Sequence, residues 1–218
     1  MGYSIAIDGP AGAGKSTIAR LVAKEKGFIY VDTGAMYRGL AVHFLKKGIR
    51  PEDTEKIKEA CRDAQVSIGY EEGQQQVYLN GENITPLLRS EEVGSMASKS
   101  SAVPEVREKL LSLQREMARS QNVVMDGRDI GTCVLPDADV KVYLTASSRT
   151  RAKRRYDELT SRGVPCDLEQ IERDIIERDS RDMNRETAPL RQAEDAVLVD
   201  SSDMTIRQVA DTILGLCR

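Results

Sequence analysis

Five short apolar segments recur along the chain, and each is followed by small or polar residues and then by a stretch with helical character. They cover residues 4–8, 28–32, 123–126, 140–145 and 196–200, and four of the five end in aspartate. Continuous apolar strands that alternate with helices predict an α/β fold with a parallel sheet covered on both faces. Ligands bind beyond the carboxyl ends of such strands, so the residues after each strand are the first candidates for function.

Residues 65–85 follow a different pattern. Apolar and polar residues alternate over 66–70, a Glu-Glu-Gly-Gln-Gln turn follows at 71–75, and the segment 77–79 leads into Asn80-Gly81. Asn-Gly between two such runs is a strong signal for a two-residue hairpin. The pattern predicts a small antiparallel meander inserted into the α/β chain, which either takes part in function or only decorates the fold.

Composition narrows the class of protein. The chain has 218 residues, of which 40% are hydrophobic and 31% charged, which is typical of one soluble globular domain with a small insertion. Its apolar runs are far shorter than the roughly 20 residues that span a bilayer, and its N-terminus lacks the pattern of a secretory signal. We therefore expect a cytoplasmic protein without a membrane partner.

The charge and the cysteines exclude several kinds of chemistry. A net charge of −3 argues against binding a nucleic acid polymer. The four cysteines form no CxxC unit and the chain has a single histidine, so reduced structural cysteines are expected rather than a zinc site or a nucleophilic thiol.

The segment after the first strand is a phosphate loop. Gly-Pro-Ala-Gly-Ala-Gly-Lys-Ser at 9–16 fits the G-x-x-x-x-G-K-[ST] pattern, between a strand and a helix as that pattern requires. Backbone N–H groups and the helix N-terminus would bind the phosphates of ATP, Lys15 would reach the β- and γ-phosphates, and the Ser16 hydroxyl would bind Mg²⁺. Asp126, which ends another strand, is either a second Mg²⁺ contact or a turn residue. The predicted ATP-binding set is Gly9, Pro10, Ala11, Gly12, Ala13, Gly14, Lys15, Ser16 and Thr17.

Two other strand ends carry charged residues. After the second strand, Thr33 is placed to cap a helix that starts near Gly34, and Arg38 faces either the ligand cleft or solvent one turn later. After the third strand, Gly127 allows a sharp turn, beyond which Arg128 could neutralise phosphate and Asp129 could accept a hydrogen bond from an amino group. A surface ion pair is the alternative for the last two residues.

Arginine is concentrated near the C-terminus, with ten arginines and ten acidic residues between positions 149 and 191. Arg178, Arg181, Asp182 and Arg185 follow the spacing of one helical face. That face either lines the cleft, where guanidinium groups offset the repulsion between phosphates, or is a solvated set of salt bridges. The basic helix predicted over residues 147–163 either closes over a nucleotide or lies on the surface.

Four motifs occur together in a specific order: the phosphate loop, Asp-Thr-Gly-Ala-Met-Tyr-Arg at 32–38, Asp-Gly-Arg-Asp at 126–129, and Glu-Arg-Asp-Ser-Arg-Asp-Met-Asn-Arg at 177–185. Over essentially its whole length the chain resembles bacterial-type cytidylate kinase, and the meander resembles the insertion that is typical of this type. The resemblance implies a P-loop NTPase-type three-layer fold with a five-stranded parallel sheet, an inserted nucleoside monophosphate-binding (NMP-binding) subdomain with a small antiparallel sheet, and a short helical lid. The expected division is a core of residues 1–31, 105–148 and 170–218, an NMP-binding subdomain of residues 32–104, and a lid of residues 149–169.

The resemblance also implies roles for single residues. Ser98 and Arg107 match positions that hold cytosine, with Asp129 and Arg185 assisting, and Arg178 and Asp182 match positions near the sugar. The expected phosphate ligands are Arg38, Arg128 and Arg181, and the expected catalytic residues are Lys15, Arg128 and Arg181. Thr33 completes the substrate-binding set, Ser16 and Asp126 are the expected Mg²⁺ contacts, and Arg154 and Arg155 lie in the lid that covers ATP. Some members have glycine after the loop lysine, where this chain has Ser16, which supplies the hydroxyl directly.

The expected reaction is Mg²⁺-dependent transfer of the ATP γ-phosphate to CMP or dCMP by a monomer. Two alternatives stay open, namely the same fold acting on UMP or another small acceptor, and a nucleotide switch without catalysis. The chain has no N-K-x-D segment of the kind that reads guanine, which weighs against a GTPase.

Overall fold

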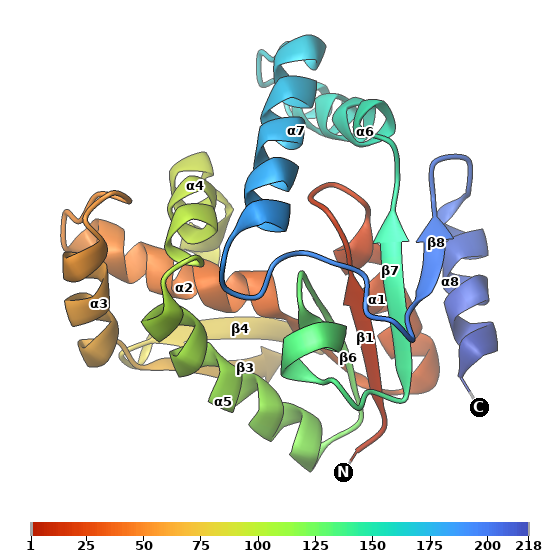
Figure 1. Ribbon diagram of the computed structural model, residues 1–218, viewed down its shortest axis with the longest axis horizontal. Coiled ribbons are helices and arrows are strands. Elements are labelled where there is room, and N and C mark those ends of the chain that lie inside the picture. Colours follow the sequence, from red (N-terminus) through yellow and green to blue (C-terminus); the bar gives the residue numbers. More distant parts are fainter. Residues whose placement is uncertain (1, 218) are drawn as a thin grey trace.

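The apolar segments form one parallel sheet in the strand order β2-β6-β1-β7-β8. The computed structural model describes residues 2–217. The strands are β1 (Ser4–Asp8), β2 (Ile29–Asp32), β6 (Val123–Gly127), β7 (Val140–Thr145) and β8 (Val197–Asp200), and all four pairings are parallel. The predicted strands are confirmed to within one residue at each end, and their carboxyl ends lie on one edge of the sheet (Figure 1).

Helices cover both faces of the sheet because successive side chains of each strand point to opposite faces. Ile5, Ile7 and Val124 pack in one buried cluster with helices α1 and α8, whereas Ala6 and Met125 pack in another with α2 and α5. The helices are α1 (Lys15–Lys26), α2 (Thr33–Lys46), α3 (Thr54–Asp63), α4 (Glu91–Ser100), α5 (Pro104–Ser120), α6 (Ser148–Ser161), α7 (Leu168–Asn184) and α8 (Ile206–Leu216). The three-layer fold is as expected.

The inserted meander is a separate three-stranded antiparallel sheet of β3 (Val66–Glu71), β4 (Gln74–Leu79) and β5 (Glu82–Asn83). The Asn80-Gly81 hairpin is confirmed. The predicted five-residue turn is wrong, because only Glu72-Gly73 turns, and the strands pair from Glu71 opposite Gln74 onward. Gln75 belongs to β4, where it pairs with Tyr70 of β3. Its side-chain amide accepts from the backbone N–H of Asp32 at 2.9 Å and donates to the Asp32 carbonyl oxygen at 3.1 Å.

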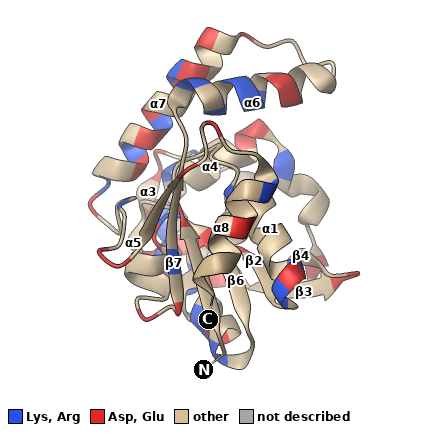
Figure 2. Cartoon of the chain, turned by 90° about the vertical axis from the view of Figure 1, so that its right-hand side faces the viewer, with Lys and Arg blue, Asp and Glu red and all other residues tan. Residues whose placement is uncertain are grey.

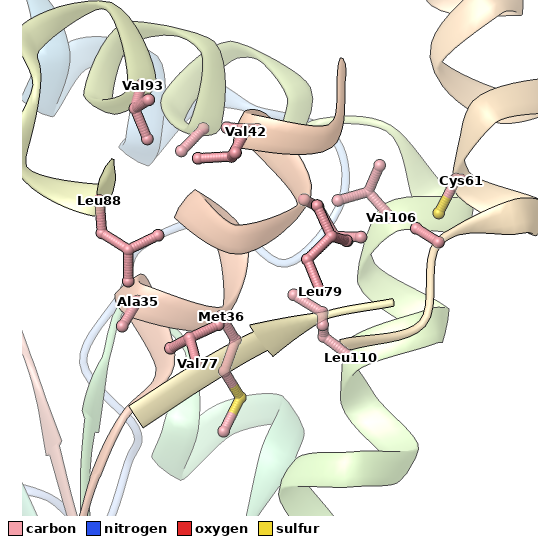
Figure 3. Close-up of a cluster of buried hydrophobic side chains, with 14 of the residues drawn as sticks. Ala35, Met36, Val42, Cys61, Val77, Leu79, Leu88, Val93, Val106 and Leu110 are labelled. Atoms are coloured by element: carbon pink, nitrogen blue, oxygen red, sulfur yellow. The ribbon is translucent and has the colours of Figure 1, made fainter. Parts of the chain in front are cut away.

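Apolar side chains of the insertion pack on α2, as Figure 3 shows for Val77, Leu79 and Met36. A short 3₁₀ turn, η1 (Thr85–Arg89), leads from β5 to α4. The insertion is therefore fixed to the element that directly follows strand β2, at the ligand edge of the sheet.

The basic segment after β7 forms a helical hairpin of α6 and α7 above that same edge (Figure 1). Ser147 caps α6 by accepting from the backbone of Thr150 at 3.1 Å. In α6 five basic residues come before two acidic ones, whereas basic and acidic residues are interspersed along α7 (Figure 2). Between residues 2 and 217, none of the helices combines the length and apolar character that crossing a membrane would require.

Candidate active site

The phosphate loop curls at the end of β1 in a conformation that needs glycine. Gly9 has a φ of +148°, and a Cβ there would lie 1.9 Å from the carbonyl oxygen of Leu144 in β7. Gly14 precedes α1 with a φ of +89° and has no side chain to cap the helix, so its first N–H groups are left for an anion. Lys15 is buried beneath the loop and donates to the carbonyl oxygen of Pro10 at 2.8 Å.

Ser16 and Asp126 lie together beside Lys15. The Ser16 hydroxyl donates to Asp126 Oδ2 at 3.2 Å, and the Tyr30 hydroxyl donates to the other carboxylate oxygen at 2.8 Å. Burial raises the pKa of Asp126 and lowers the pKa of Lys15, because neither charge is solvated. A hydroxyl and a buried carboxylate supply the hard oxygen ligands that Mg²⁺ takes, so these two residues fit a magnesium ion.

Two cavities meet at the phosphate loop and share Gly12, Lys15 and Ser16. The first, of about 280 Å³, opens between the strand ends and the helices α2, α4, α5 and α7. The second, of about 370 Å³, opens between the loop and α6. Apart from the loop, the first cavity is lined mainly by predicted site residues, namely Thr33, Arg38, Ser98, Arg107, Asp126, Arg128, Asp129, Arg178, Asp182 and Arg185.

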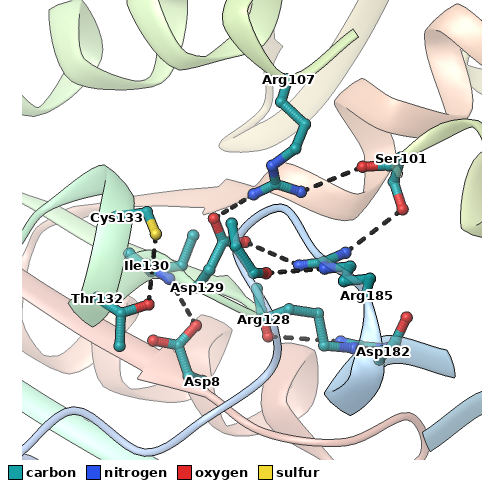
Figure 4. Close-up of polar contacts among 12 residues, drawn as sticks. Asp8, Ser101, Arg107, Arg128, Asp129, Ile130, Thr132, Cys133, Asp182 and Arg185 are labelled. Carbon is teal, nitrogen blue, oxygen red and sulfur yellow. Dashed lines mark hydrogen bonds and ion pairs between the residues drawn. The ribbon is translucent and has the colours of Figure 1, made fainter. Parts of the chain in front are cut away.

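Asp129 is the centre of a polar network at the end of the first cavity where α4 and α5 meet. Its carboxylate forms an ion pair with Arg107 and a longer one with Arg185, whose Nη2 lies 3.5 Å away. Ser101 connects these two arginines, accepting from Arg107 through its carbonyl oxygen and from Arg185 through its hydroxyl, each at 3.4 Å (Figure 4). The Ser98 hydroxyl oxygen, also at this cavity, is buried and has no hydrogen-bond partner among the described residues.

A second charged cluster connects strand β6 to helix α7. The Arg128 Nε donates to Asp182 Oδ2 at 2.9 Å, and Arg178 lies on the same helix face as Asp182. Burial is the main cause that lowers the pKa of Arg178 to about 10, and the positive charge of Arg128 is the second. Burial alone would raise the pKa of Asp182, but Arg128 and Arg178 outweigh it and hold that pKa below its usual range. The cluster has an excess of positive charge, which suits a phosphate group.

The start of α2 departs from the prediction. Asp32, not Thr33, caps the helix by accepting from the backbone N–H of Ala35 at 2.8 Å. Thr33 is the first helical residue, and its buried hydroxyl donates to the Asp126 carbonyl oxygen at 2.7 Å. Aspartate and threonine are both good N-cap residues. Strand β2 ends at Asp32, so the aspartate occupies the N-cap position of α2. Arg38 lines the cavity with its Nη2 3.0 Å from Asp32 Oδ2.

Comparison with known proteins agrees with this geometry. The family model for cytidylate kinase matches residues 5–218. The chain is 48% identical to the cytidylate kinase of Caldicellulosiruptor bescii over 98% of its own length and 94% of that protein. It is 45% identical to the cytidylate kinase of Thermotoga petrophila, with 100% of the chain and 98% of that protein covered.

The chain belongs to the cytidylate kinase family. A crystal structure of an uncharacterized protein from Eubacterium ventriosum has a TM-score of 0.52 at 13% identity and covers 98% of this chain and 96% of that one, which supports the fold alone. The resemblance predicted from the four motifs is therefore confirmed, and each family-derived site residue can be compared with its place in the structure.

Among the predicted site residues outside the phosphate loop, Arg181 is the one that lines neither cavity of this cytidylate kinase family member. Its side chain is 44% exposed and lies 3.7 Å from Glu177, one turn earlier on α7. Arg154 and Arg155 do line the cavity beside the loop, together with Thr17. Arg154 donates to the Ser201 carbonyl oxygen at 2.7 Å.

Three residues near the cleft were not predicted as site residues from the sequence. Tyr30 orients Asp126, as described above. Arg151 is 5% exposed, donates to the Ala11 carbonyl oxygen of the loop at 2.9 Å and pairs with Asp179 of α7 at 2.6 Å. Asp8, also buried, accepts from the backbone that follows Asp129. The only signal for Asp8 was its place as the charged last residue of an apolar strand.

Proposed function

We propose that the chain transfers the γ-phosphoryl group of ATP to CMP or dCMP, giving ADP and CDP or dCDP. The observation that carries the proposal is the meeting of two cavities at Lys15, one beside the basic helix α6 and one ending at the Asp129 network. ATP would occupy the cavity beside α6, and the acceptor would occupy the cavity that ends at the Asp129 network. Membership of the cytidylate kinase family supports the same acceptor.

The Asp129 network is suited to reading cytosine. A carboxylate accepts from the exocyclic amino group of cytosine, and uracil has a carbonyl oxygen at that position. The unpartnered Ser98 hydroxyl and the Arg107 guanidinium can bond to the remaining polar edge of the base. A buried polar group left unmatched disfavours an acceptor that lacks the partner, so the network selects CMP over UMP.

The sugar and acceptor phosphate would lie between this network and the loop. Asp182 can accept from ribose hydroxyls, with Arg178 beside it. Arg38 and Arg128 are the proposed phosphate ligands, and Arg38 would exchange its partner Asp32 for the phosphate. Arg181 would join them only after α7 moves toward the cleft, since it pairs with Glu177 on the outside of the helix.

The donor nucleotide would be bound by the loop residues 9–17, with Arg154 and Arg155 covering it from α6. Ser16 and Asp126 would hold Mg²⁺, which when bound neutralises the phosphate oxygens and aligns the β- and γ-phosphates. The proposed units are a core of residues 1–31, 105–148 and 170–218, an NMP-binding part of residues 32–104, and a lid of residues 149–169. We propose that the enzyme acts as a monomer and place it in the cytoplasm with its substrates.

The chemistry needs positioning and charge stabilisation. An oxygen of the acceptor phosphate attacks the γ-phosphorus in line, a new O–P bond forms, and the bond to the β-phosphate oxygen breaks. The acceptor is already an anion, so no strong general base and no covalent enzyme intermediate are required. Lys15 and Arg128 neutralise charge on the transferring group, and closure of α6 and α7 keeps out water that would hydrolyse ATP.

An acceptor panel tests the proposal against both alternatives. Initial rates with MgATP and CMP, dCMP, UMP or AMP at equal concentrations should favour CMP and dCMP over UMP. A preference for UMP or AMP would move the function to another acceptor of the same fold. Nucleotide binding without turnover on any acceptor would support the nucleotide switch and overturn the proposal.

A further inference from the structure

Asp8 links the phosphate loop to the segment that carries Asp129, and its side chain faces neither cavity. It is the last residue of β1, directly before Gly9 of the phosphate loop, and it is 5% exposed. It does not line either of the two cavities described above. Asp8 can therefore act on the reaction through the residues that its carboxylate holds, and through its charge, which favours the protonated form of Lys15.

Those residues are the two that follow Asp129. Asp8 Oδ1 accepts from the backbone N–H of Ile130 and Oδ2 from that of Gly131, each at 2.7 Å. These two residues begin a short π-helical turn, η2 (Ile130–Val134). Asp129 directly precedes this turn, but its side chain is directed to Arg107 and Arg185 (Figure 4). Asp8 thus takes the place of the local cap and leaves Asp129 available to the cavity.

The turn is packed closely against this carboxylate. A Cβ on Gly131 would lie 3.4 Å from Asp8 Oδ2 and 3.2 Å from the Lys141 side chain. A Cβ on Gly127, on the other side of Arg128 and Asp129, would lie 2.6 Å from the Ile130 side chain. The segment has little room to shift, so its position follows that of β1.

A carboxylate in this place is costly to keep ionised. Burial raises the pKa of Asp8 to about 6, although the two backbone N–H groups and Lys15 act in the opposite direction. An asparagine would have nearly the same size and no charge, but its NH₂ group cannot accept from a second N–H. The geometry is therefore built for two acceptor oxygens.

We infer that Asp8 is a positioning residue for base selection, holding Asp129 and Arg128 at a fixed place relative to the phosphate loop. This inference rests on the proposed function, in which Asp129 reads the base and Arg128 the acceptor phosphate. A misplacement of about 1 Å in such a site can lower the rate roughly 100-fold. Loss of the second acceptor would let the segment turn away from the loop, which affects the acceptor and not the donor.

The test is the substitution Asp8→Asn, studied with CMP, UMP and ADP. We expect kcat/KM for CMP to fall by about 10–100-fold and the CMP-to-UMP ratio to fall by about tenfold. ADP affinity without acceptor, measured by calorimetry, should stay within about twofold because the loop backbone is untouched. Calorimetric affinities for CMP and UMP should show the same loss of preference without turnover.

The matched control is Asp139→Asn. Asp139 Oδ2 accepts from the backbone N–H of Ser4 at 2.7 Å and from its hydroxyl at 3.3 Å, so a single carboxylate oxygen holds the opposite end of the same strand. This variant should keep the wild-type CMP-to-UMP ratio. If it loses the preference as Asp8→Asn does, the effect belongs to strand β1 in general and the inference is wrong.

Two other results would overturn the inference. One is a folded Asp8→Asn enzyme with the wild-type CMP-to-UMP ratio, and the other is an ADP affinity that falls as much as CMP affinity does. If circular dichroism shows that Asp8→Asn does not fold, Gly131→Ala is the second variant, because its Cβ crowds the Asp8 carboxylate from the turn. Gly131→Ala must then lower the CMP-to-UMP ratio, and an unchanged ratio would overturn the inference. A wild-type protein that binds CMP selectively but transfers no phosphate would refute the proposed function. The ratio of the calorimetric affinities for CMP and UMP would still decide the role of Asp8.

Discussion

Lys15 donates a hydrogen bond across the phosphate loop to the carbonyl oxygen of Pro10, 2.8 Å away. The lysine is 6% exposed, and burial and the Arg128 guanidinium lower its pKa. Its ammonium group is therefore held inside the loop, where phosphate oxygens would replace the carbonyl as its partner. A buried cation that gains an anion becomes easier to keep protonated, so nucleotide binding should favour the charged form.

The first prediction concerns Lys15→Ala. We expect kcat to fall by about 10²–10³-fold because the variant lacks the proposed charge contact to the transferring phosphate. Circular dichroism should show an intact fold. The matched control is Lys24→Ala, an exposed lysine of the same helix, which should keep wild-type rates. Near-normal phosphoryl transfer by folded Lys15→Ala would contradict the assignment.

Asp129→Ala should damage the use of CMP more than the binding of ATP. The substitution removes the proposed acceptor for the cytosine amino group and leaves Arg107 and Arg185 without their shared carboxylate. A buried polar group left unmatched costs about 1–3 kcal/mol, so the CMP-to-UMP ratio of kcat/KM should fall about tenfold or more. Asp137→Ala, at an exposed position, is the control. An unchanged ratio would show that Asp129 does not read the base.

The prediction for Arg181 depends on motion of α7. If closure brings its guanidinium to the transferring phosphate, Arg181→Ala should lower kcat about 100-fold while ADP affinity stays near that of the wild type. If it stays beside Glu177, the substitution should change little. Single-turnover rates of this variant, compared with Arg173→Ala on the exposed side of the same helix, decide between these outcomes.

Arg181 also shows where sequence reasoning reaches its limit. Arg178, Asp182 and Arg185 are separated by four and three residues and fall within a narrow angular range on the helix, whereas Arg181 lies at the edge of that range. The spacing predicted one shared face, and three of the four residues line the cavity. Sequence spacing does not fix the direction of a side chain around the helix axis closely enough to exclude Arg181 from the cleft.

The strands and the phosphate loop were predictable because their signals are local. Each strand is a continuous apolar segment, and the loop is a run of eight residues between a strand and a helix. The contacts of Asp8 and Arg151 were not predictable in this way, because their partners Ile130 and Ala11 are 122 and 140 residues away in the chain. Such partners are decided by the strand order, which places β6 and β7 on either side of β1.

A pH-dependent contribution to stability is expected from His43, the single histidine of the chain. Its ring is buried, with Nε2 3.1 Å from the Ala60 carbonyl oxygen, and burial and the nearby Lys47 lower its pKa. The unfolded chain therefore binds a proton more readily than the folded one as the pH falls below about 6.5, and stability decreases.

The variant His43→Gln should remove this contribution while leaving activity unchanged, because His43 lies at neither cavity. Thermal unfolding by circular dichroism at about pH 7.5 and about pH 5.5 measures it, since that interval brackets the usual histidine pKa. The loss of melting temperature on acidification should be smaller in the variant than in the wild type. An equal loss in both proteins would show that His43 contributes nothing in this interval.

Asp182 is the last test, because it distinguishes a contact to the sugar from a contact that only holds α7. Its carboxylate accepts from Arg128 Nε at 2.9 Å and stays ionised, since the neighbouring guanidinium groups hold its pKa below the usual range despite burial. Asp182→Ala removes the proposed acceptor for ribose hydroxyls and releases Arg128. We expect a higher KM for CMP and a lower kcat, because a loosely held acceptor is misaligned for in-line attack.

The CMP-to-dCMP comparison gives the decisive reading of Asp182→Ala. A contact to the 2′-hydroxyl predicts a larger loss with CMP than with dCMP, and a contact to the 3′-hydroxyl alone predicts equal losses with both. ADP affinity should change little in either case, because the phosphate loop lies on another element. The exposed Asp174→Ala on the same helix is the control for a general loss of acidic charge. Wild-type kinetics with both acceptors in a folded Asp182→Ala enzyme would mean that the pair with Arg128 serves only the packing of α7 against the core.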